Sequence, residues 1–135
     1  MNAFADIGQR CDAIEECYEF MLAYAAQGID DDRQSRHGGQ LRELLARAVD
    51  AATGIPEAYA GMLAAVDPAM APQYNRFLEV LKADTGKALA AMELVLVQPC
   101  IPSQLIDNLN ASVHVRTLLT DIFLLDEIPN LRQTP

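Results

Sequence analysis

The spacing of apolar positions along the chain predicts helices almost throughout. In the first segment, apolar residues follow one another at alternating intervals of three and four, which is typical of a helix packed at a shallow angle on its neighbours. The members of this seam are Phe4, Ile7, Cys11, Ile14, Tyr18, Met21 and Ala25. A helix is therefore predicted over residues 3–27, and Gly28 follows it as a left-handed stop.

A second apolar line runs beside this seam and contains Cys17, Phe20 and Tyr24. An apolar surface of this width is broader than one packing stripe, so the helix needs two partners. We interpret one partner as the rest of a helical bundle and the other as a second subunit. Cys17, Phe20 and Tyr24 are accordingly predicted to be interface residues.

The remaining pattern predicts four more helices, over residues 31–53, 56–66, 72–97 and 103–127. Pro56 suits the first turn of the short helix, because its missing N–H has no partner to lose there. Pro99 and Pro102 forbid a continuous helix between the last two segments, and Pro129 closes the final one. Residues 130–135 are expected to form a loose tail.

Long helices joined by short links predict an all-α fold. The expected architecture is an antiparallel four-helix bundle with an additional short helix, residues 56–66, between the second and third long helices. The composition agrees, since 51% of the residues are hydrophobic but only 6% are aromatic. The sequence contains no repeat or flexible linker, so residues 1–135 are expected to form a single domain.

The charge balance argues against several classes of partner. Ten Lys and Arg against 19 Asp and Glu give a net charge of -9, which repels nucleic-acid backbones and anionic lipid. The start "MNAFADIGQRCDAIEE" has no basic region, and no apolar run approaches the roughly 20 residues that span a bilayer. Three unevenly spaced cysteines fit reduced thiols. We expect a cytoplasmic protein that binds neither nucleic acid nor membrane.

The sequence lacks a complete catalytic or metal-binding pattern. A di-iron bundle needs Glu-x-x-His pairs and a structural zinc site needs closely spaced Cys or His, and neither pattern occurs. Cys100 lies between two prolines with no local base that would lower its pKa. We therefore expect no metal, no cofactor and no catalytic residue, and consider an enzymatic role the less favoured interpretation.

Two surface features have simple interpretations. Glu15 and Glu19 lie one helical turn apart and are interpreted as a solvated acidic face. In the last predicted helix, polar residues at intervals of three and four form one stripe that includes His114. This stripe is interpreted as solvent-exposed, with contact to a polar partner as the less favoured alternative. The members of the stripe are Ser103, Asp107, Asn110, His114, Thr117 and Asp121.

The stretch "DDDRQSRHGGQLRELL" at residues 30–45 admits two structures. If a helix begins at the aspartates, one of them caps it, and Gly38 and Gly39 lie inside it at a cost of about 1 kcal/mol each relative to Ala. Such a cost indicates close approach of another backbone. If the chain is irregular up to Gly39, the residues around the helix start make a candidate anion site. That site would comprise Arg33, Arg36, His37, Gly38 and Gly39.

Two signatures of helical bundles are incomplete in this stretch. Histidine phosphotransfer domains follow their histidine with a lysine, which "RHGGQL" lacks. Helical ribonucleases of the HEPN class separate Arg from His by four to six residues, whereas three residues separate Arg33 from His37. No family is assigned, and the capping signals favour the early helix start over the anion site.

These patterns predict a non-catalytic protein–protein interaction module. Its role would be accessory, regulatory or chaperone-like, with another protein or a second copy of itself as partner. The predicted interface residues are Cys17, Phe20, Tyr24, Gly38 and Gly39. The alternative is a bundle that binds a small ligand or anion around Arg33, Arg36, His37 and the two glycines.

Overall fold

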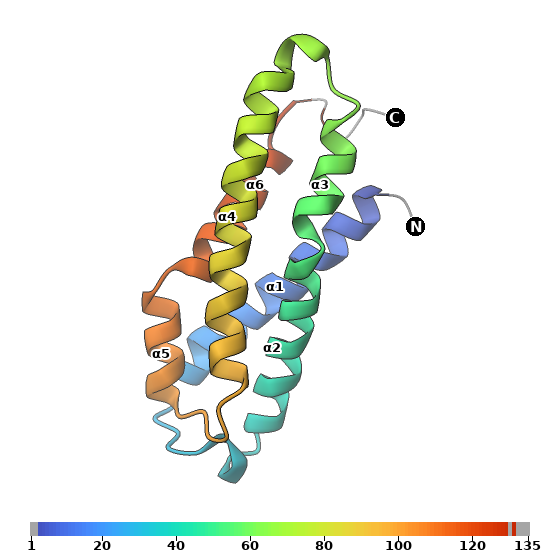
Figure 1. Cartoon of the computed structure of the whole chain (residues 1–135). Helices are drawn as coiled ribbons and strands as arrows, with labels where there is room; N and C mark the ends of the chain where they lie inside the picture. Colours follow the sequence, from blue (N-terminus) through green and yellow to red (C-terminus); the bar gives the residue numbers. More distant parts are fainter. Residues whose placement is uncertain (1–2, 130, 132–135) are drawn as a thin grey trace.

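The computed structural model describes residues 3–129 and 131, except for the side chains of residues 3 and 4, and this part of the chain is all-helical without strands (Figure 1). It contains six α-helices and two short 3-10 turns. The α-helices are α1 (Ala3–Ala25), α2 (Gly38–Thr53), α3 (Ile55–Leu63), α4 (Ala71–Leu96), α5 (Ser103–Ala111) and α6 (His114–Asp126). The 3-10 turns are η1 (Asp32–Gln34) and η2 (Pro68–Met70).

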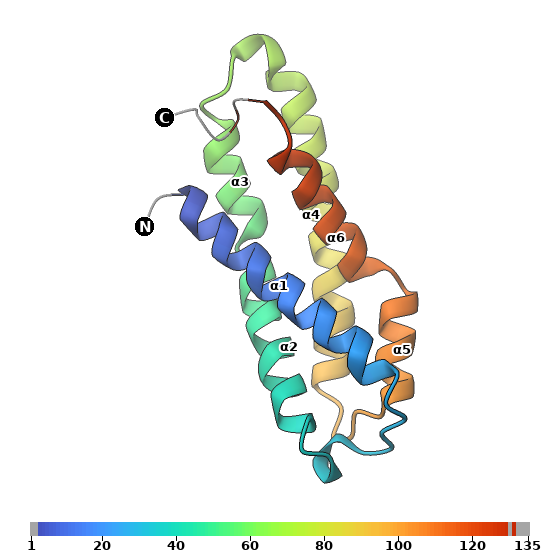
Figure 2. The same cartoon turned by 180° about the vertical axis from the view of Figure 1, so that it is seen from behind.

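The helices are arranged around α1 and α4, which lie on opposite sides of the molecule. Figure 1 views the structure from the α4 side, and Figure 2 views it from the α1 side. Helix α4 runs antiparallel to α2 and α3 and packs against both of them and against α6. Helix α1 packs mainly against α2 and α5 and also contacts α3 and α6. Buried side chains from all six α-helices form one connected core.

The predicted seam of the first helix is largely confirmed. Ile7, Cys11, Ile14 and Met21 are buried, whereas the seam position at Phe4 lies outside the described side chains. Gly28 follows the helix with a φ of +66°, which confirms the left-handed stop. The wide apolar surface of α1 is covered by helices of the same chain, mainly α2 and α5 with additional contacts from α3 and α6. The width of that surface therefore does not require a second subunit.

The last predicted helix, over residues 103–127, is wrong as a single element. The chain forms two helices, α5 and α6, and changes direction between them at Val113, whose φ of +58° is left-handed. A left-handed conformation is rare for a β-branched residue, because its branched side chain crowds the backbone.

The reason for this break is a change of buried face. Ile106 and Leu109 are buried in α5, and Leu118 and Ile122 are buried in α6. At about 100° per residue, these two pairs would point to roughly opposite sides of a continuous helix. The turn at Val113 re-orients the chain so that both pairs face the same core.

The predicted solvent-exposed stripe of this segment is also wrong, since a broken helix cannot carry one continuous face. Ser103 and Asp121, at its two ends, are buried, and Asn110 is half-buried with its Nδ2 donating to the Met21 carbonyl at 3.3 Å. His114 is half-buried at the start of α6. Polar residues are therefore built into the packing of this half of the molecule.

The ends of the third and fourth predicted helices agree with the structure to within three residues. The helices predicted over residues 56–66 and 72–97 correspond to α3 and α4. The tail expected over residues 130–135 lies outside the described residues except for Leu131, which is buried and donates its N–H to the Ile128 carbonyl at 3.3 Å. Among the described helices, none combines the length and hydropathy needed to cross a bilayer.

Candidate functional site

The segment between α1 and α2 corrects the predicted helix over residues 31–53. The aspartate cap exists, but the Asp31 side chain accepts from the Arg33 N–H at 2.9 Å and so caps the 3-10 turn η1. Residues 35–37 form a further turn, and α2 begins at Gly38. The real start of the helix thus corresponds more closely to the alternative that we favoured less.

A partly buried ion pair holds this segment in place. Asp32 is only 3% exposed, and its Oδ2 accepts from Arg42 Nε at 2.6 Å while its Oδ1 accepts from the Ile101 N–H at 2.6 Å. Arg42 also donates to the main-chain carbonyls of Leu96 at 3.1 Å and Gln98 at 2.8 Å. One pair of side chains therefore joins η1, α2, the end of α4 and the loop that follows it.

A second set of hydrogen bonds closes the same end of the molecule. Tyr24 Oη donates to the Ile101 carbonyl at 2.7 Å, and Ser103 Oγ donates to the Tyr24 carbonyl at 2.7 Å. Ser103 Oγ also accepts from the Ile29 N–H at 2.9 Å, and the Ser103 N–H donates to the Ile29 carbonyl at 2.7 Å. This end is consequently a connected polar network whose members satisfy one another.

The pKa of Asp32 reflects these contacts. Burial acts to raise the pKa, but the hydrogen bonds from Arg42 and from the Ile101 N–H outweigh it and hold the pKa below its ordinary value. Asp32 is thus ionised at neutral pH and paired. Its role is structural, because both of its oxygens already have partners inside the chain.

The positive charge of Arg33 in the candidate anion site is already paired with a carboxylate. Arg33 binds its own neighbour, with Nη2 at 2.8 Å from Asp31 Oδ2 and Nε at 3.0 Å from Oδ1. Arg36 is exposed, and the His37 ring contacts the edge of Phe20 with centroids 6.5 Å apart. Because the charge of Arg33 is already neutralised, anion binding here stays a prediction without support from the geometry.

The two glycines of that stretch have different surroundings. Gly38 is buried against the main chain of Asp32, so that a Cβ at this position would overlap the Asp32 carbonyl. Gly39 is exposed, and a Cβ there would meet nothing within 4 Å. Gly38 is therefore inaccessible to a partner, which corrects its place among the predicted interface residues, whereas contact at Gly39 stays a prediction.

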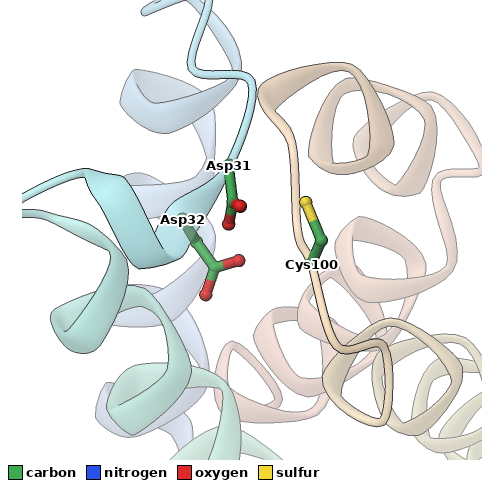
Figure 3. A group of neighbouring side chains, drawn as sticks. All are labelled: Asp31, Asp32 and Cys100. Carbon is green, nitrogen blue, oxygen red and sulfur yellow. The ribbon is translucent and has the colours of Figure 1, made fainter.

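Asp31, Asp32 and Cys100 form the cluster of potential metal ligands in the described part of the chain (Figure 3). One ligand atom from each residue lies within 4.8 Å of the others, and the side chains face one another from two chain segments. Both carboxylates are already bound by guanidinium groups, those of Arg33 and Arg42. A cation would have to displace these arginines, so the cluster fits a hydrogen-bonded junction better than a metal site.

Cys100 adds no reactive thiol to this junction. Its Sγ lies 3.5 Å from the Asp30 carbonyl. Burial, with the negative charge of Asp31 next in effect, raises the pKa of the Cys100 thiol. A protonated thiol is a poor nucleophile and a poor metal ligand.

The predicted interface on α1 requires correction at two of its three positions. Cys17 and Tyr24 are fully buried in the core of the single chain, so neither side chain is available to a partner. Burial raises the pKa of Cys17 to about 12, which leaves the thiol inert at neutral pH. Phe20 is half-buried and stacks on Tyr24 with ring centroids 6.5 Å apart.

A groove between α1 and α6 lies on another face of the same helix. We call it the α1–α6 groove, and its volume is about 310 Å³. Its walls are two helical faces, each with residues at positions i, i+3, i+4 and i+7. The lining residues are Glu15, Tyr18, Glu19 and Leu22 from α1 and Arg116, Leu119, Thr120 and Phe123 from α6. The two helices run antiparallel along it (Figure 2).

The groove combines exposed apolar side chains with charge. Leu22 is 50% exposed and Phe123 is 44% exposed, and Leu124 beside Phe123 is 58% exposed. Glu15 and Glu19 line the α1 wall, and Arg116 lines the α6 wall. None of these three charged side chains forms an ion pair with another described residue within 4 Å. The groove has no direct signal in the sequence, because Glu15 and Glu19 fit a simple acidic face and the register of α6 depends on the break at Val113.

A pair of carboxyl groups joins α4 to α6. Asp121 is 9% exposed, and its Oδ2 is buried without a hydrogen bond from any described donor. Burial, followed by the hydrogen bond with Asp84 and its negative charge, raises the pKa of Asp121 to about 7. With this pKa the Asp121 carboxyl group keeps its proton to a higher pH than an ordinary aspartate.

Comparisons with protein-family models, with curated proteins and with solved structures find no match for this chain.

Proposed function

We propose that this protein is a small, non-catalytic accessory or regulatory protein that binds an amphipathic helix of a partner protein in the α1–α6 groove. The observation that carries the proposal is the groove itself, with exposed Leu22 and Phe123 beside Glu15 and Glu19. Large apolar side chains exposed together are typical of interaction sites in soluble proteins. A helix that binds in such a groove contacts it through apolar residues at positions i, i+3, i+4 and i+7. The lining residues of α1 and of α6 have this same spacing.

The charges of the groove define the chemistry of the partner. Glu15 and Glu19 lie one turn apart on the α1 wall, so they match Lys or Arg side chains one turn apart on an incoming helix. The overall charge of -9 attracts a basic segment over a longer range and increases its association rate. We therefore infer that the bound helix has an apolar face with basic residues on the flank that meets α1, and none on the flank that meets Arg116.

Other aspects of the proposal concern architecture and location. If α2 with α3 and α5 with α6 are each treated as one interrupted rod, the chain resembles an antiparallel four-helix bundle, and we propose this description of it. Rigid helices on both sides of the groove support a preformed site that needs little reorganisation on binding. Free thiols at Cys11, Cys17 and Cys100 are in keeping with a cytoplasmic protein.

A designed peptide pair tests the proposal. The first is a dye-labelled helix of about 18 residues with leucines at i, i+3, i+4 and i+7 and lysines on the flank. The second has the same composition in shuffled order. Fluorescence anisotropy at physiological ionic strength should show binding of the patterned peptide and at least about tenfold weaker binding of the shuffled one.

Variants of the protein locate the binding site. Phe123→Ala and Glu19→Lys should each weaken binding of the patterned peptide by about tenfold, because they remove an apolar anchor and reverse a matched charge. Met70→Ala in η2 is the control, since Met70 is 51% exposed but lies away from the groove. Equal affinity for both peptides, or equal effects of Phe123→Ala and Met70→Ala, would overturn the proposal.

A further inference from the structure

The outer face of α4, continued by its C-cap residue Val97, carries a second apolar surface, which we call the α4 stripe. Its residues are Val80, Ala83, Lys87, Ala90, Leu94 and Val97. They follow one another at intervals of 3, 4, 3, 4 and 3, which is the spacing of a coiled-coil seam. All six are exposed, with Val80 at 43%, Leu94 at 66% and Val97 at 74%. No other described helix presents three large exposed apolar residues along one such stripe.

The stripe has no partner within the described chain, because α4 packs into the core through its opposite face. That inner face buries Leu81, Thr85, Ala88, Met92 and Val95. In Figure 1, α4 crosses in front of α1 and α6, with its outer side directed away from them. The α4 stripe is therefore an amphipathic surface with a seam pattern and nothing packed on it.

We propose that this surface is the contact face of a symmetric homodimer in which α4 packs antiparallel on α4 of a second copy. The spacing of the stripe is the same in both chain directions, as a two-fold symmetric contact requires. In the antiparallel register that matches its two ends, Val80 meets the partner's Val97. Leu94 then meets the partner's Ala83, so that a large side chain faces a small one across the contact.

Lys87 fits the same register. It lies opposite the partner's Ala90, which leaves room for its aliphatic stem while the ammonium group reaches the solvent at the edge. A single charged residue in such a seam reduces stability but selects one register and one oligomeric state. Lys87 therefore favours one register of the two α4 helices in the dimer.

The charges beside the stripe agree with this arrangement. Lys82 and Glu93 are 11 residues apart, which is about three turns, and they lie on the same flank of α4. The point halfway between Lys82 and Glu93 along α4 lies within about one residue of the centre of the α4 stripe, through which the two-fold axis of the proposed dimer would pass. In a two-fold antiparallel pair each flank faces its own copy, so Lys82 of each chain faces the partner's Glu93, and two ion pairs form. Within the chain Lys82 contacts only the exposed Glu79, at 3.3 Å, among the described acids.

The consequence is a bivalent particle. The α4 side and the α1 side of the molecule are opposite (Figures 1 and 2). A dimer through α4 therefore leaves both α1–α6 grooves open on its outer surfaces. The bivalency rests on the proposed function of the groove, whereas the dimer itself does not.

Light scattering after size exclusion, on the full chain over a range of micromolar concentrations, tests the dimer. The unmodified protein should have the mass of a dimer, and Leu94→Asp should have that of a monomer with an unchanged circular dichroism spectrum. The matched control is Leu124→Asp on α6, a leucine of similar exposure at 58%, which should remain dimeric. A monomeric unmodified protein, or a dimer lost in Leu124→Asp but kept in Leu94→Asp, would overturn the proposal.

A charge exchange tests the register. Lys82→Glu or Glu93→Lys alone should weaken dimerisation about three- to tenfold, since each places like charges opposite one another twice. The double variant Lys82→Glu/Glu93→Lys should restore the dimerisation constant to within about twofold of the original. Additive weakening in the double variant would exclude the antiparallel register. Because this readout is mass and not peptide binding, its failure is separable from failure of the groove proposal.

Discussion

Gly38 lies with its Cα against the main-chain carbonyl of Asp32, so closely that a side-chain carbon at position 38 would overlap that oxygen. This contact lets the first turn of α2 cross the 3-10 turn η1 at minimal separation. It also brings Asp32 beneath α2, where Arg42 of the same helix reaches its carboxylate at 2.6 Å. A single missing Cβ thus makes room for the ion pair that closes this end of the molecule.

Substitution of Gly38 by Ala should destabilise the fold by about 2 kcal/mol, because the main chain of Asp32 must shift to admit the methyl group. Urea unfolding followed by circular dichroism measures the change. Gly39→Ala is the matched control, since its Cβ would enter open space and Ala is the better helix former. The control should be neutral or more stable by up to about 1 kcal/mol. Equal losses in the two variants would contradict the close contact at Gly38.

The Asp32–Arg42 pair should show strong coupling. Asp32→Ala leaves Arg42 without its anion and the Ile101 N–H without its acceptor, so we expect a loss of about 3 kcal/mol. A double-mutant cycle with Arg42→Ala should give a coupling free energy of about 1–3 kcal/mol. Arg47→Ala is the control, because its contact with Glu16 is 3.8 Å long and exposed. Strictly additive losses would mean that the two residues act independently.

The pair should also contribute to acid unfolding. The pKa of Asp32 is lower in the folded state than its ordinary value, so the unfolded chain binds its proton first as the pH falls. The stabilisation by Asp32 is present above the ordinary aspartate pKa and is lost as the pH falls through the folded-state pKa. The unfolding free energy of Asp32→Ala should therefore change less with pH in this acidic range than that of the unmodified protein.

The sequence predicts the long helices well, because their evidence is local. The periodic apolar residues of α1 and the prolines around α4 are sufficient to place these elements. The start of α2 is different. Asp31 gives a genuine capping signal, but whether it caps a 3-10 turn or an α-helix depends on contacts of Arg42 with Leu96 and Gln98, more than 50 residues away. The local sequence pattern around Asp31 carries no information about contacts with residues so far along the chain.

The break between α5 and α6 has a signal in the sequence that our interpretation overlooked. The apolar positions change face between Leu109 and Val115, and neither Gly nor Pro marks the change. A prediction that treats residues 103–127 as one continuous helix assigns the wrong residues of α6 to the core. It therefore does not place Phe123 on the face that lies next to Glu15. The α1–α6 groove was therefore beyond prediction, although each of its walls has a regular helical spacing.

The carboxyl pair between α4 and α6 predicts an unusual pH dependence. Asp121 has a higher pKa in the folded than in the unfolded state, so the folded chain retains a proton that the unfolded chain has lost. The resulting stabilisation is complete below the ordinary aspartate pKa and declines as the pH rises to about 7. The decline has an upper limit of about 1.4 kcal/mol per pH unit.

Asp121→Asn should remove this decline, because the amide donates to Asp84 without ionising. Urea unfolding between pH 5 and pH 8 should give a flatter profile for the variant and a higher unfolding free energy than that of the unmodified protein at the alkaline end. Asp107→Asn, at an exposed position of α5, serves as the control and should keep the original profile. A profile that Asp121→Asn leaves unchanged would show that the pKa of Asp121 is not raised in the folded chain.

Val113 predicts a gain in stability on substitution. Its φ of +58° is unfavourable for a β-branched residue by about 1–2 kcal/mol, and glycine adopts the same conformation without that cost. Val113 is 47% exposed, so its removal sacrifices little buried surface. Val113→Gly should therefore raise the unfolding free energy by about 1 kcal/mol, after the greater flexibility of glycine in the unfolded chain is included. Ala46→Gly, at an exposed position inside α2, should lower it by about 1 kcal/mol instead. If both variants lost stability equally, the left-handed turn between α5 and α6 would be the wrong conformation.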